Sequence, residues 1–372
     1  MEGDRADSGG AQTFKSTDTD PGEVTKGTPR RAAVMFSGGG DSSLASGVLS
    51  RLLDEVHLVT YETDVDIFVK FSEKSSDALK RAFPGKVRHS IMPIPPWWMD
   101  NQVRHWDCLH FACITCKFIM HVRTIIYCLE NAIPLAADGA IQEEVHNPEQ
   151  MPGVLDTLKR FYGEYGIRHI HPSYFYTVGK EDAALRELGI DMGNRVRAPG
   201  LKGYHIHRQP YCVLANVVGV FLSNPYSDNL IHEEVVRHLE SDLDYGRAII
   251  RAYFEEKGED LDALIERVRE QSIPPEDVLA SMDHRRELSP EEQTAKTIRQ
   301  QYDEAGAPNR AIGDIVRFFM LSSMFVEGLV YFSAASLWNQ QLRRLTGTIY
   351  SYLGLRAKQA VGLGGARSGK DV

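Results

Sequence analysis

Hydrophobic and polar positions follow two regular patterns along the first half of the chain. Short apolar runs, typical of strands buried on both faces, alternate with longer segments whose apolar residues recur every three or four positions, as they do in helices. The predicted strands are 32–36, 56–61, 86–93, 134–137 and 167–171, and the predicted helices are 41–53, 75–83, 113–131, 151–165 and 181–188. This alternation predicts βαβ units, and therefore an α/β fold in which a doubly wound parallel sheet carries helices on both faces.

After residue 229 the strand pattern fades, and we expect a separate, all-helical C-terminal region. Helical periodicity extends over 230–257, 260–271, 290–305, 310–337 and 340–355. The first residues are rich in Gly, Asp, Thr and Ser and cannot bury enough surface to offset their ordering entropy. The expected organisation is a disordered leader at 1–30, the α/β domain at 31–229, the helical region at 230–357 and a flexible tail at 358–372.

Composition indicates a soluble globular protein. Hydrophobic residues make up 42% of the 372 positions, which is sufficient for a buried core. The most apolar later stretch, 311–342, is interrupted by Asp314, Arg317 and Glu327, so we expect no membrane span. An odd number of cysteines, five, and a leader without the apolar core of a secretory signal favour reduced thiols and a cytoplasmic location. The apolar, aromatic helices at 318–355 offer a surface for a homodimer.

The acidic net charge of −9 is concentrated in one segment. Residues 231–304 include 20 acidic and 10 basic side chains, which leaves the rest of the chain at +1. The charge balance therefore does not exclude RNA as a partner of the α/β domain.

A glycine-rich loop, SGGGDSS, links the first predicted strand to the first predicted helix. Backbone N–H groups in such a loop point at one spot beside the positive end of a helix dipole, and this favours an anion such as a nucleotide phosphate. We expect Asp41 to hold Mg²⁺ or to shape the pyrophosphate pocket. The predicted phosphate site consists of Ser37, Gly38, Gly39, Gly40, Asp41, Ser42 and Ser43.

A second phosphate-loop pattern, GGARSGK at 364–370, is a near match to a Walker A motif. Asp371 follows it where Ser or Thr is needed, no convincing strand leads into it, and the chain ends too soon for a helix. We therefore do not expect it to bind nucleotide.

The SGGGDSS loop resembles the PP-loop of the N-type ATP pyrophosphatases, which share an adenine-nucleotide α-hydrolase-like fold related to the Rossmann fold. The resemblance covers residues 32–225. It implies binding of ATP and Mg²⁺, cleavage of ATP between its α and β phosphates, transfer of the adenylyl group to a carbonyl oxygen, and release of pyrophosphate.

Three other segments share this resemblance. The stretch 171–190 is similar to the family's strand, loop, Lys and helix, which implies that Lys180 faces the phosphates. The sequence AADG places Gly139 in a short nucleotide loop. Tyr61 and Glu62 end the second strand, where the family usually contacts adenine.

The cysteines bear on what replaces the activated oxygen. Cys113 and Cys116 form a CxxC at the start of a predicted helix, whose dipole would lower a thiol pKa, and Cys212 follows a proline much later. This arrangement resembles the two-thiouridine and two-thiocytidine tRNA thiolases, which implies that the three residues hold a 4Fe-4S cluster with one iron left to carry sulfur. Cys108 extends the run to C-x4-C-x2-C, so zinc is an alternative, as is a persulfide on Cys113 resolved by Cys212 or Cys116. Cys128 is expected to be a core residue.

The resemblance as a whole implies an ATP-dependent sulfurtransferase. It would adenylate a carbonyl oxygen of a nucleobase and replace that oxygen with sulfur, releasing AMP and pyrophosphate, with Cys113, Cys212 and Asp41 in catalytic roles. The substrate, a free nucleobase-like molecule or tRNA, and the sulfur donor stay open. The alternatives are an amidating or ligating enzyme of the 7-cyano-7-deazaguanine synthase type and a non-catalytic nucleotide-binding assembly module.

Four further features carry weaker functional signals. The HxH pairs His169/His171 and His205/His207 would each share a strand face and could bind metal. The segment 194–210 is a basic loop able to approach phosphate, and 94–106 is a Trp-rich loop whose rings stack on a base or, more commonly, cover the sheet. Three residues after the Gly139 turn are placed to contact substrate or metal: Glu143, Glu144 and His146.

Overall fold

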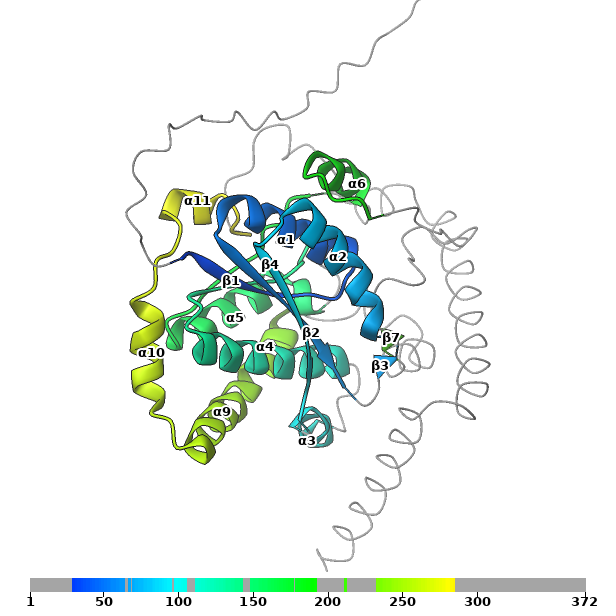
Figure 1. Ribbon diagram of the computed structural model, residues 1–372. Helices are drawn as coiled ribbons and strands as arrows, with labels where there is room; N and C mark the ends of the chain where they lie inside the picture. The colour runs from blue at the N-terminus through cyan, green and yellow to red at the C-terminus, as the bar shows by residue number, and fades with distance from the viewer. Residues whose placement is uncertain are drawn as a thin grey trace, which may run out of the picture.

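The computed structural model describes residues 29–63, 66–67, 69–95, 97–105, 111–142, 148–176, 178–192, 211–212 and 232–284 (Figure 1). Its centre is a five-stranded parallel sheet with strand order β4-β2-β1-β5-β6. In chain order the strands are β1 (Arg31–Met35), β2 (Glu55–Glu62), β4 (Val87–Pro93), β5 (Leu135–Ala137) and β6 (Arg168–Ile170). The α/β fold with a doubly wound parallel sheet, expected from the sequence, is confirmed.

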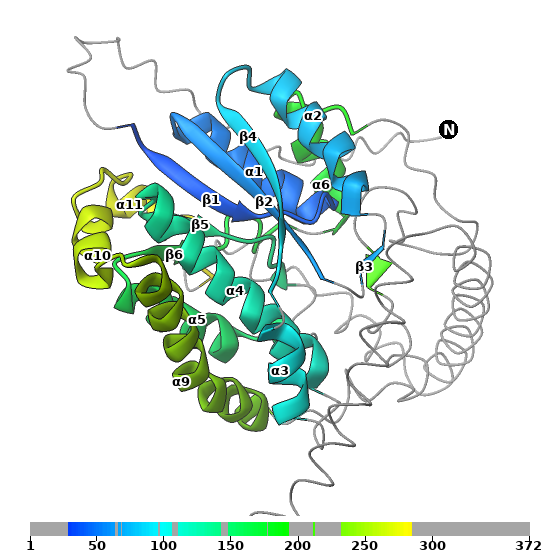
Figure 2. The same ribbon diagram turned by 60° about the horizontal axis from the view of Figure 1, so that its bottom comes forward.

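Helices cover both faces of the sheet (Figure 2). Adjacent strand residues point to opposite faces: Ala32 and Val34 of β1 belong to one apolar cluster, and Ala33 belongs to the other. The first cluster is covered by α1 (Gly40–Leu52), α2 (Ser72–Ala82), α6 (Val178–Glu187) and α11 (Glu276–Ala280), and the second by α4 (Ala112–Asn131) and α5 (Pro152–Glu164). Because both faces of the strands are buried, the strands read as apolar runs without alternation.

Two of the described C-terminal helices extend the second layer. They are α9 (His232–Lys257) and α10 (Leu261–Arg269), and α9 packs against both α4 and α5. The apolar residues Leu239, Ile250 and Phe254 of α9 are buried in the same cluster as Ala33 of the sheet. This part of the helical region therefore shares a core with the sheet. The predicted boundary at residue 229, the leader, the helices expected beyond residue 284, their dimer surface and the tail all lie outside the described residues.

Two short features were not predicted from the pattern. The sequence predicts a loop at 94–106, but Trp97–Arg104 form helix α3. The prediction of a loop is therefore wrong for this segment. The helix is held by α9, since buried Asn101 donates to Asp242 at 3.0 Å and the ring of Trp97 contacts Tyr253 edge-on. A two-residue strand β3 (Asp66–Ile67) pairs antiparallel with β7 (Tyr211–Cys212), and these strands are too short to produce a pattern. The 3-10 helices are η1 (Val69–Phe71) and η4 (Pro148–Gln150).

The topology places one crevice at the carboxyl edge of the sheet. From β1 the chain proceeds to β2 on one side, whereas β5 pairs with β1 on the other side. The order therefore reverses between β1 and β5, and ligands of doubly wound sheets bind at such a switch point. The loops that follow β1 and β5 flank this point.

Among the described helices, none is long and apolar enough to cross a membrane.

Candidate functional site

The loop after β1 is shaped to receive an anion. Gly38 has φ +81°, a left-handed conformation that residues with a side chain rarely adopt, and Ser75 of α2 donates to its carbonyl at 2.7 Å. The hydroxyl of Ser43 donates to the carbonyl of Gly39 at 2.7 Å, and this turns the chain into α1. Gly39 is the N-cap and makes no side-chain capping bond. The first helical turn therefore presents backbone N–H groups at the loop, an arrangement that favours a bound phosphate.

The serines of the loop are held close together. Ser37 and Ser42 lie 3.2 Å apart between their hydroxyl oxygens, and the amide of Gly39 donates to Ser37 Oγ at 3.2 Å. Asp41 lies in the first turn of α1 and is half-buried. The structure therefore brings the predicted loop residues into one small volume at the start of α1.

A second helix begins beside the same loop. The carboxylate of Glu181, in the first turn of α6, occupies the space where a side chain at Gly40 would lie. Farther along α1, Gly47 packs against Leu188 and the residue that follows the turn after α6, Ile190. Helices α1 and α6 therefore run in the same direction with their N-termini together. Two positive dipole ends therefore meet at the loop, where the carboxylate of Glu181 offsets part of their charge.

Lys180 and Glu181, which are adjacent near the start of α6, differ in their exposure to solvent. The side chain of Lys180 is exposed, whereas Glu181 is 5% exposed and lies against the loop. A flexible, exposed lysine can reach toward a phosphate bound at the loop. Glu181 was not predicted as a site residue, because nothing in its spacing from the glycine loop indicates contact, and only its position next to Lys180 could have suggested it.

The turn after β5 forms the opposite wall of the site. A β-carbon at Gly139 would lie 2.6 Å from the backbone nitrogen of Ser42 and 3.0 Å from the carbonyl carbon of Asp41. The turn is fixed by Asp138, whose Oδ1 accepts from the amide of Ala140 at 3.0 Å. Gly139 thus contacts the glycine loop directly, across the switch point of the sheet.

Tyr61, at the end of β2, faces the core. Its hydroxyl lies 2.6 Å from Oγ1 of Thr124 on α4, and burial raises the pKa of the phenol. The hydroxyl and ring are therefore engaged between the sheet and α4. Contact with adenine at this strand end would fall to the backbone.

The CxxC cysteines lie at the carboxyl edge of the sheet. Helix α4 has 20 residues, about 30 Å, and ends just before β5 begins, so its N-terminus reaches the edge at which the strands end. Cys113 and Cys116 are both half-buried there, near the positive end of the helix dipole. Cys128, farther along α4, is fully buried, and burial raises the pKa of its thiol. It is a core residue, as expected.

The third predicted cysteine, Cys212, lies in the two-stranded sheet of β3 and β7, which follows β2 at the carboxyl edge of the main sheet. Cys212 of β7 pairs with Asp66, which follows β2 by four residues. A CxxC at the start of a helix supplies thiolates of the kind that bind an iron–sulfur cluster or zinc. Cys108 lies outside the described residues, as do three other predicted groups: the basic loop 194–210, His205/His207, and Glu143, Glu144 and His146.

A buried cluster of histidines surrounds Asp138. His171 Nδ1 lies 2.8 Å from Asp138 Oδ1, and His169 Nε2 lies 3.3 Å from Asp138 Oδ2, so the predicted HxH pair does share a strand face. His121 of α4 completes the cluster, its ring centre 5.4 Å from that of His169. Burial lowers the pKa of His169 to about 4 and, with repulsion from His169, lowers the pKa of His121 well below its usual value. Burial alone would raise the pKa of Asp138, but the nearby imidazoles of His171 and His169 outweigh it and lower that pKa.

A second cluster lies between α3, α4 and α9. His105 Nε2 and Asp242 Oδ1 are 2.5 Å apart, and His238 Nε2 lies 2.8 Å from Oγ1 of Thr115, the residue before Cys116. Neither cluster was predicted as a unit. His121, Asp138, His238 and Asp242 come from segments far apart in the sequence, and no local spacing joins them.

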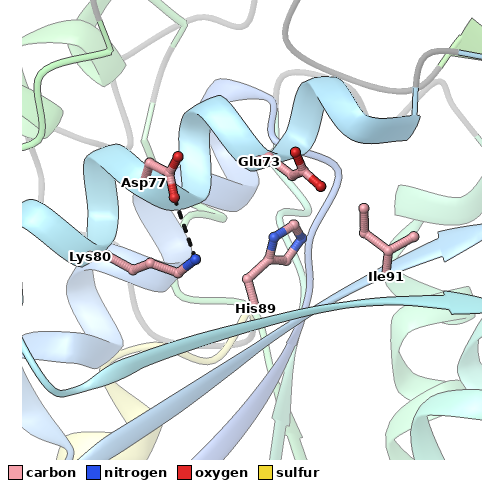
Figure 3. Close-up of a pocket in the computed structure, with 5 residues that line it drawn as sticks. All are labelled: Glu73, Asp77, Lys80, His89 and Ile91. Atoms are coloured by element: carbon pink, nitrogen blue, oxygen red, sulfur yellow. Dashed lines mark hydrogen bonds and ion pairs between the residues drawn. The ribbon is translucent and has the colours of Figure 1, made fainter.

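A cavity of about 320 Å³ lies away from the loop, between α2 and β4 (Figure 3). Glu73, Asp77 and Lys80 of α2 line one side, and His89 and Ile91 of β4 line the other. Lys80 bonds Asp77 at 3.4 Å. The lining contains no residue of the glycine loop, the Gly139 turn or the CxxC, so this cavity is not the candidate site.

Comparisons with known proteins add two structural similarities. No protein-family model matches the chain. No curated protein matches it. A predicted subunit of a tRNA methyltransferase from Methanocaldococcus jannaschii is 18% identical over 42% of this chain and 76% of that chain, with a TM-score of 0.29. The U34-tRNA thiolase NcsA from Methanococcus maripaludis, described with its 4Fe-4S cluster, is 11% identical over 66% of this chain and 74% of that chain, with a TM-score of 0.33. At these scores, the geometry of the site rather than either similarity carries the functional proposal.

Proposed function

We propose that the chain is an ATP-dependent sulfurtransferase that adenylates a carbonyl oxygen of a nucleobase. The observation that carries the proposal is the meeting of two helix N-termini, those of α1 and α6, at a glycine loop on the switch point of a parallel sheet. This arrangement supports binding of a polyphosphate. In this proposal Asp41, at the start of α1, holds Mg²⁺, and the exposed Lys180 of α6 supplies a positive charge to the phosphates.

The first step is attack of the substrate's carbonyl oxygen on the α-phosphorus of ATP. The P–O bond to the β-phosphate breaks, pyrophosphate leaves with the bonding electrons, and the oxygen becomes part of an AMP leaving group. Backbone amides at the loop and Lys180 stabilise the negative charge that develops on the phosphates. Gly139, packed against Ser42, keeps the loop in place.

The second step replaces the oxygen with sulfur. Hydrosulfide attacks the activated carbon, the C–O bond breaks, AMP leaves with the bonding electrons, and the S–H proton is lost. If the outer sulfur of a persulfide on Cys113 attacks instead, the thiolate of Cys116 or Cys212 then attacks the sulfur of Cys113, which breaks the S–S bond, releases the thiolated product and leaves a disulfide between the two cysteines. We propose that Cys113, Cys116 and Cys212 deliver this sulfur, since they reach the carboxyl edge at which the nucleotide loop lies. A 4Fe-4S cluster bound by these three residues would supply an iron to which sulfur attaches; a persulfide on Cys113 is the alternative route.

The proposal is tested with anaerobically purified protein, Mg-ATP and sulfide. Total tRNA or a protein-free metabolite extract is added, and AMP, pyrophosphate and thiolated product are quantified. We expect AMP to form with one of the two substrates and thiolated product to be lost in Cys113→Ala. Cys128→Ala, a buried cysteine of the same helix, is the matched control and should retain product.

The same experiment separates the alternatives. AMP formation with ammonia in place of sulfide, and no thiolated product, would favour an amidating enzyme. Absence of AMP with every substrate and nucleophile would leave only a nucleotide-binding module. Stimulation by tRNA or by the extract identifies the substrate class.

A further inference from the structure

The cluster around Asp138 has the composition of a metal site. His121 comes from α4, Asp138 from the turn after β5, and His169 from β6, and they are 1%, 2% and 1% exposed. One ligand atom from each lies within 4.8 Å of the other two. Two imidazole nitrogens and one carboxylate oxygen are the donors that zinc and related divalent ions take in proteins.

The buried nitrogens of this cluster lack the hydrogen bonds that burial normally requires. His121 Nε2 and His169 Nδ1 make none, and His169 Nε2 has only Asp138 Oδ2, at 3.3 Å, beside it. A buried polar atom without a partner destabilises the folded state. An electron-pair acceptor bound between the two rings would take up His121 Nε2 and one nitrogen of His169.

The neighbours of the three residues orient them as ligands. His121 Nδ1 lies 3.0 Å from the hydroxyl of Tyr162, and in the tautomer in which Nδ1 donates, the lone pair of Nε2 is available to a metal. His171 engages one oxygen of Asp138 and leaves Oδ2 toward His169. The ring of Tyr162 stacks on that of His169 at 4.4 Å between centres. Metal-binding histidines are commonly fixed by partners of this kind.

We propose that His121, Asp138 and His169 bind one first-row divalent metal ion, for which Zn²⁺ is the best chemical fit. Ligand atoms of a tetrahedral zinc lie about 3.4 Å apart, so the widest pair moves together on binding. The ion ties α4, β5 and β6 together directly beneath Gly139. It therefore fixes the turn that packs on the nucleotide loop, and this structural role does not depend on the reaction proposed above.

Two other groups of side chains could take up the same metal and must be separated from this one. The second cluster already satisfies its imidazoles internally, through His105 with Asp242 and His238 with Thr115. The thiols of Cys113 and Cys116 form a softer set, which gives an intense thiolate-to-cobalt charge-transfer absorption that nitrogen and oxygen ligands lack.

The test uses the full chain with Cys113→Ser and Cys116→Ser, stripped by a chelator and titrated with Co²⁺ and with Zn²⁺. We expect one equivalent of Co²⁺ to bind with visible d–d absorption and no thiolate charge transfer, and Zn²⁺ to displace it and raise the melting temperature. In the same background, His121→Gln and Asp138→Asn should each weaken binding at least about tenfold. His238→Gln is the matched control and should bind as the parent does.

Three results would overturn the proposal. One is failure of the chain with Cys113→Ser and Cys116→Ser to bind Co²⁺. Another is binding that His121→Gln and Asp138→Asn leave unchanged. The third is binding lost only in His238→Gln, which would assign the ion to the second cluster. If a cluster variant fails to fold, X-ray absorption of the zinc-loaded parent with Cys113→Ser and Cys116→Ser decides: a first shell of nitrogen and oxygen with imidazole scattering supports the site, and its absence contradicts it.

Discussion

Gly139 and Ser42, nearly a hundred residues apart, lie so close that a β-carbon on Gly139 would come within 2.6 Å of the Ser42 amide nitrogen. Gly139 follows β5 and Ser42 lies in the first turn of α1, so the contact closes the crevice between β1 and β5. A β-carbon on Gly139 would push against backbone atoms of Asp41 and Ser42. These atoms form the start of α1 and cannot move without changing the anion site.

Gly139→Ala should therefore weaken ATP binding. The methyl group pushes the turn and the start of α1 apart, and we expect a loss of stability of about 1 to 3 kcal/mol and an ATP affinity at least about tenfold lower. Equilibrium dialysis with labelled ATP and chemical denaturation measure the two effects. The control is Gly163→Ala in α5, where a β-carbon meets nothing within 4 Å. Equal ATP affinity in the two variants would show that the turn does not shape the nucleotide site.

Lys180→Ala should reduce ATP affinity by about tenfold, the worth of one charge-assisted contact. The loss should shrink at high salt, because the side chain is exposed and its charge is screened. Arg186→Ala removes a positive charge from the last turn of the same helix and should change affinity little. Binding isotherms at two salt concentrations test this, and a larger effect of Arg186→Ala would contradict the placement of Lys180.

Tyr61→Phe should change stability and leave nucleotide binding intact. The variant removes the bond between the Tyr61 hydroxyl and Thr124, which lies in the core, and we expect a loss of about 1 kcal/mol. The ATP dissociation constant should stay within about twofold of the parent value, since the hydroxyl faces α4. A large rise in that constant at unchanged stability would instead place the phenol against adenine.

His89 should make the protein less stable in mild acid. Burial, with a smaller contribution from Lys80, lowers the pKa of His89 to about 4 in the folded state, against about 6.5 unfolded. Above pH 6.5 the ring is neutral in both states and contributes no pH dependence. Between pH 6.5 and 4 only the unfolded chain takes up the proton, so the free energy of unfolding falls, by at most about 3 kcal/mol from this group.

His89→Gln isolates this contribution. Thr60 donates its hydroxyl proton to the carbonyl of Phe36, so His89 Nε2 donates to Thr60, and a glutamine amide can replace that donor. Urea unfolding at pH 7.5, 6, 5 and 4 should show a shallower decline for the variant than for the parent. Identical slopes would mean that folding does not lower the pKa of His89.

The sequence by itself determined the layout of strands and helices. Buried parallel strands require apolar runs, and helices that cover a sheet require apolar residues at a period near 3.6, so both patterns are written locally. Ten predicted elements between residues 31 and 188 occur within a few residues of their expected bounds. The glycine loop was predictable for the same reason, since its turn and helix start are contiguous. The segment that forms α3 was not, because that helix depends on Asn101 meeting Asp242 of α9.

Only the tertiary structure decided which distant residues meet. The order of strands brings Gly139 to Ser42, parallel packing of α6 on α1 brings Glu181 to Gly40, and the path of α4 brings His121 to Asp138. Each of these contacts depends on how the layers stack, and stacking is set by side-chain packing across the whole sheet. A local pattern records which face of an element is apolar; it does not record which residue of another element lies opposite.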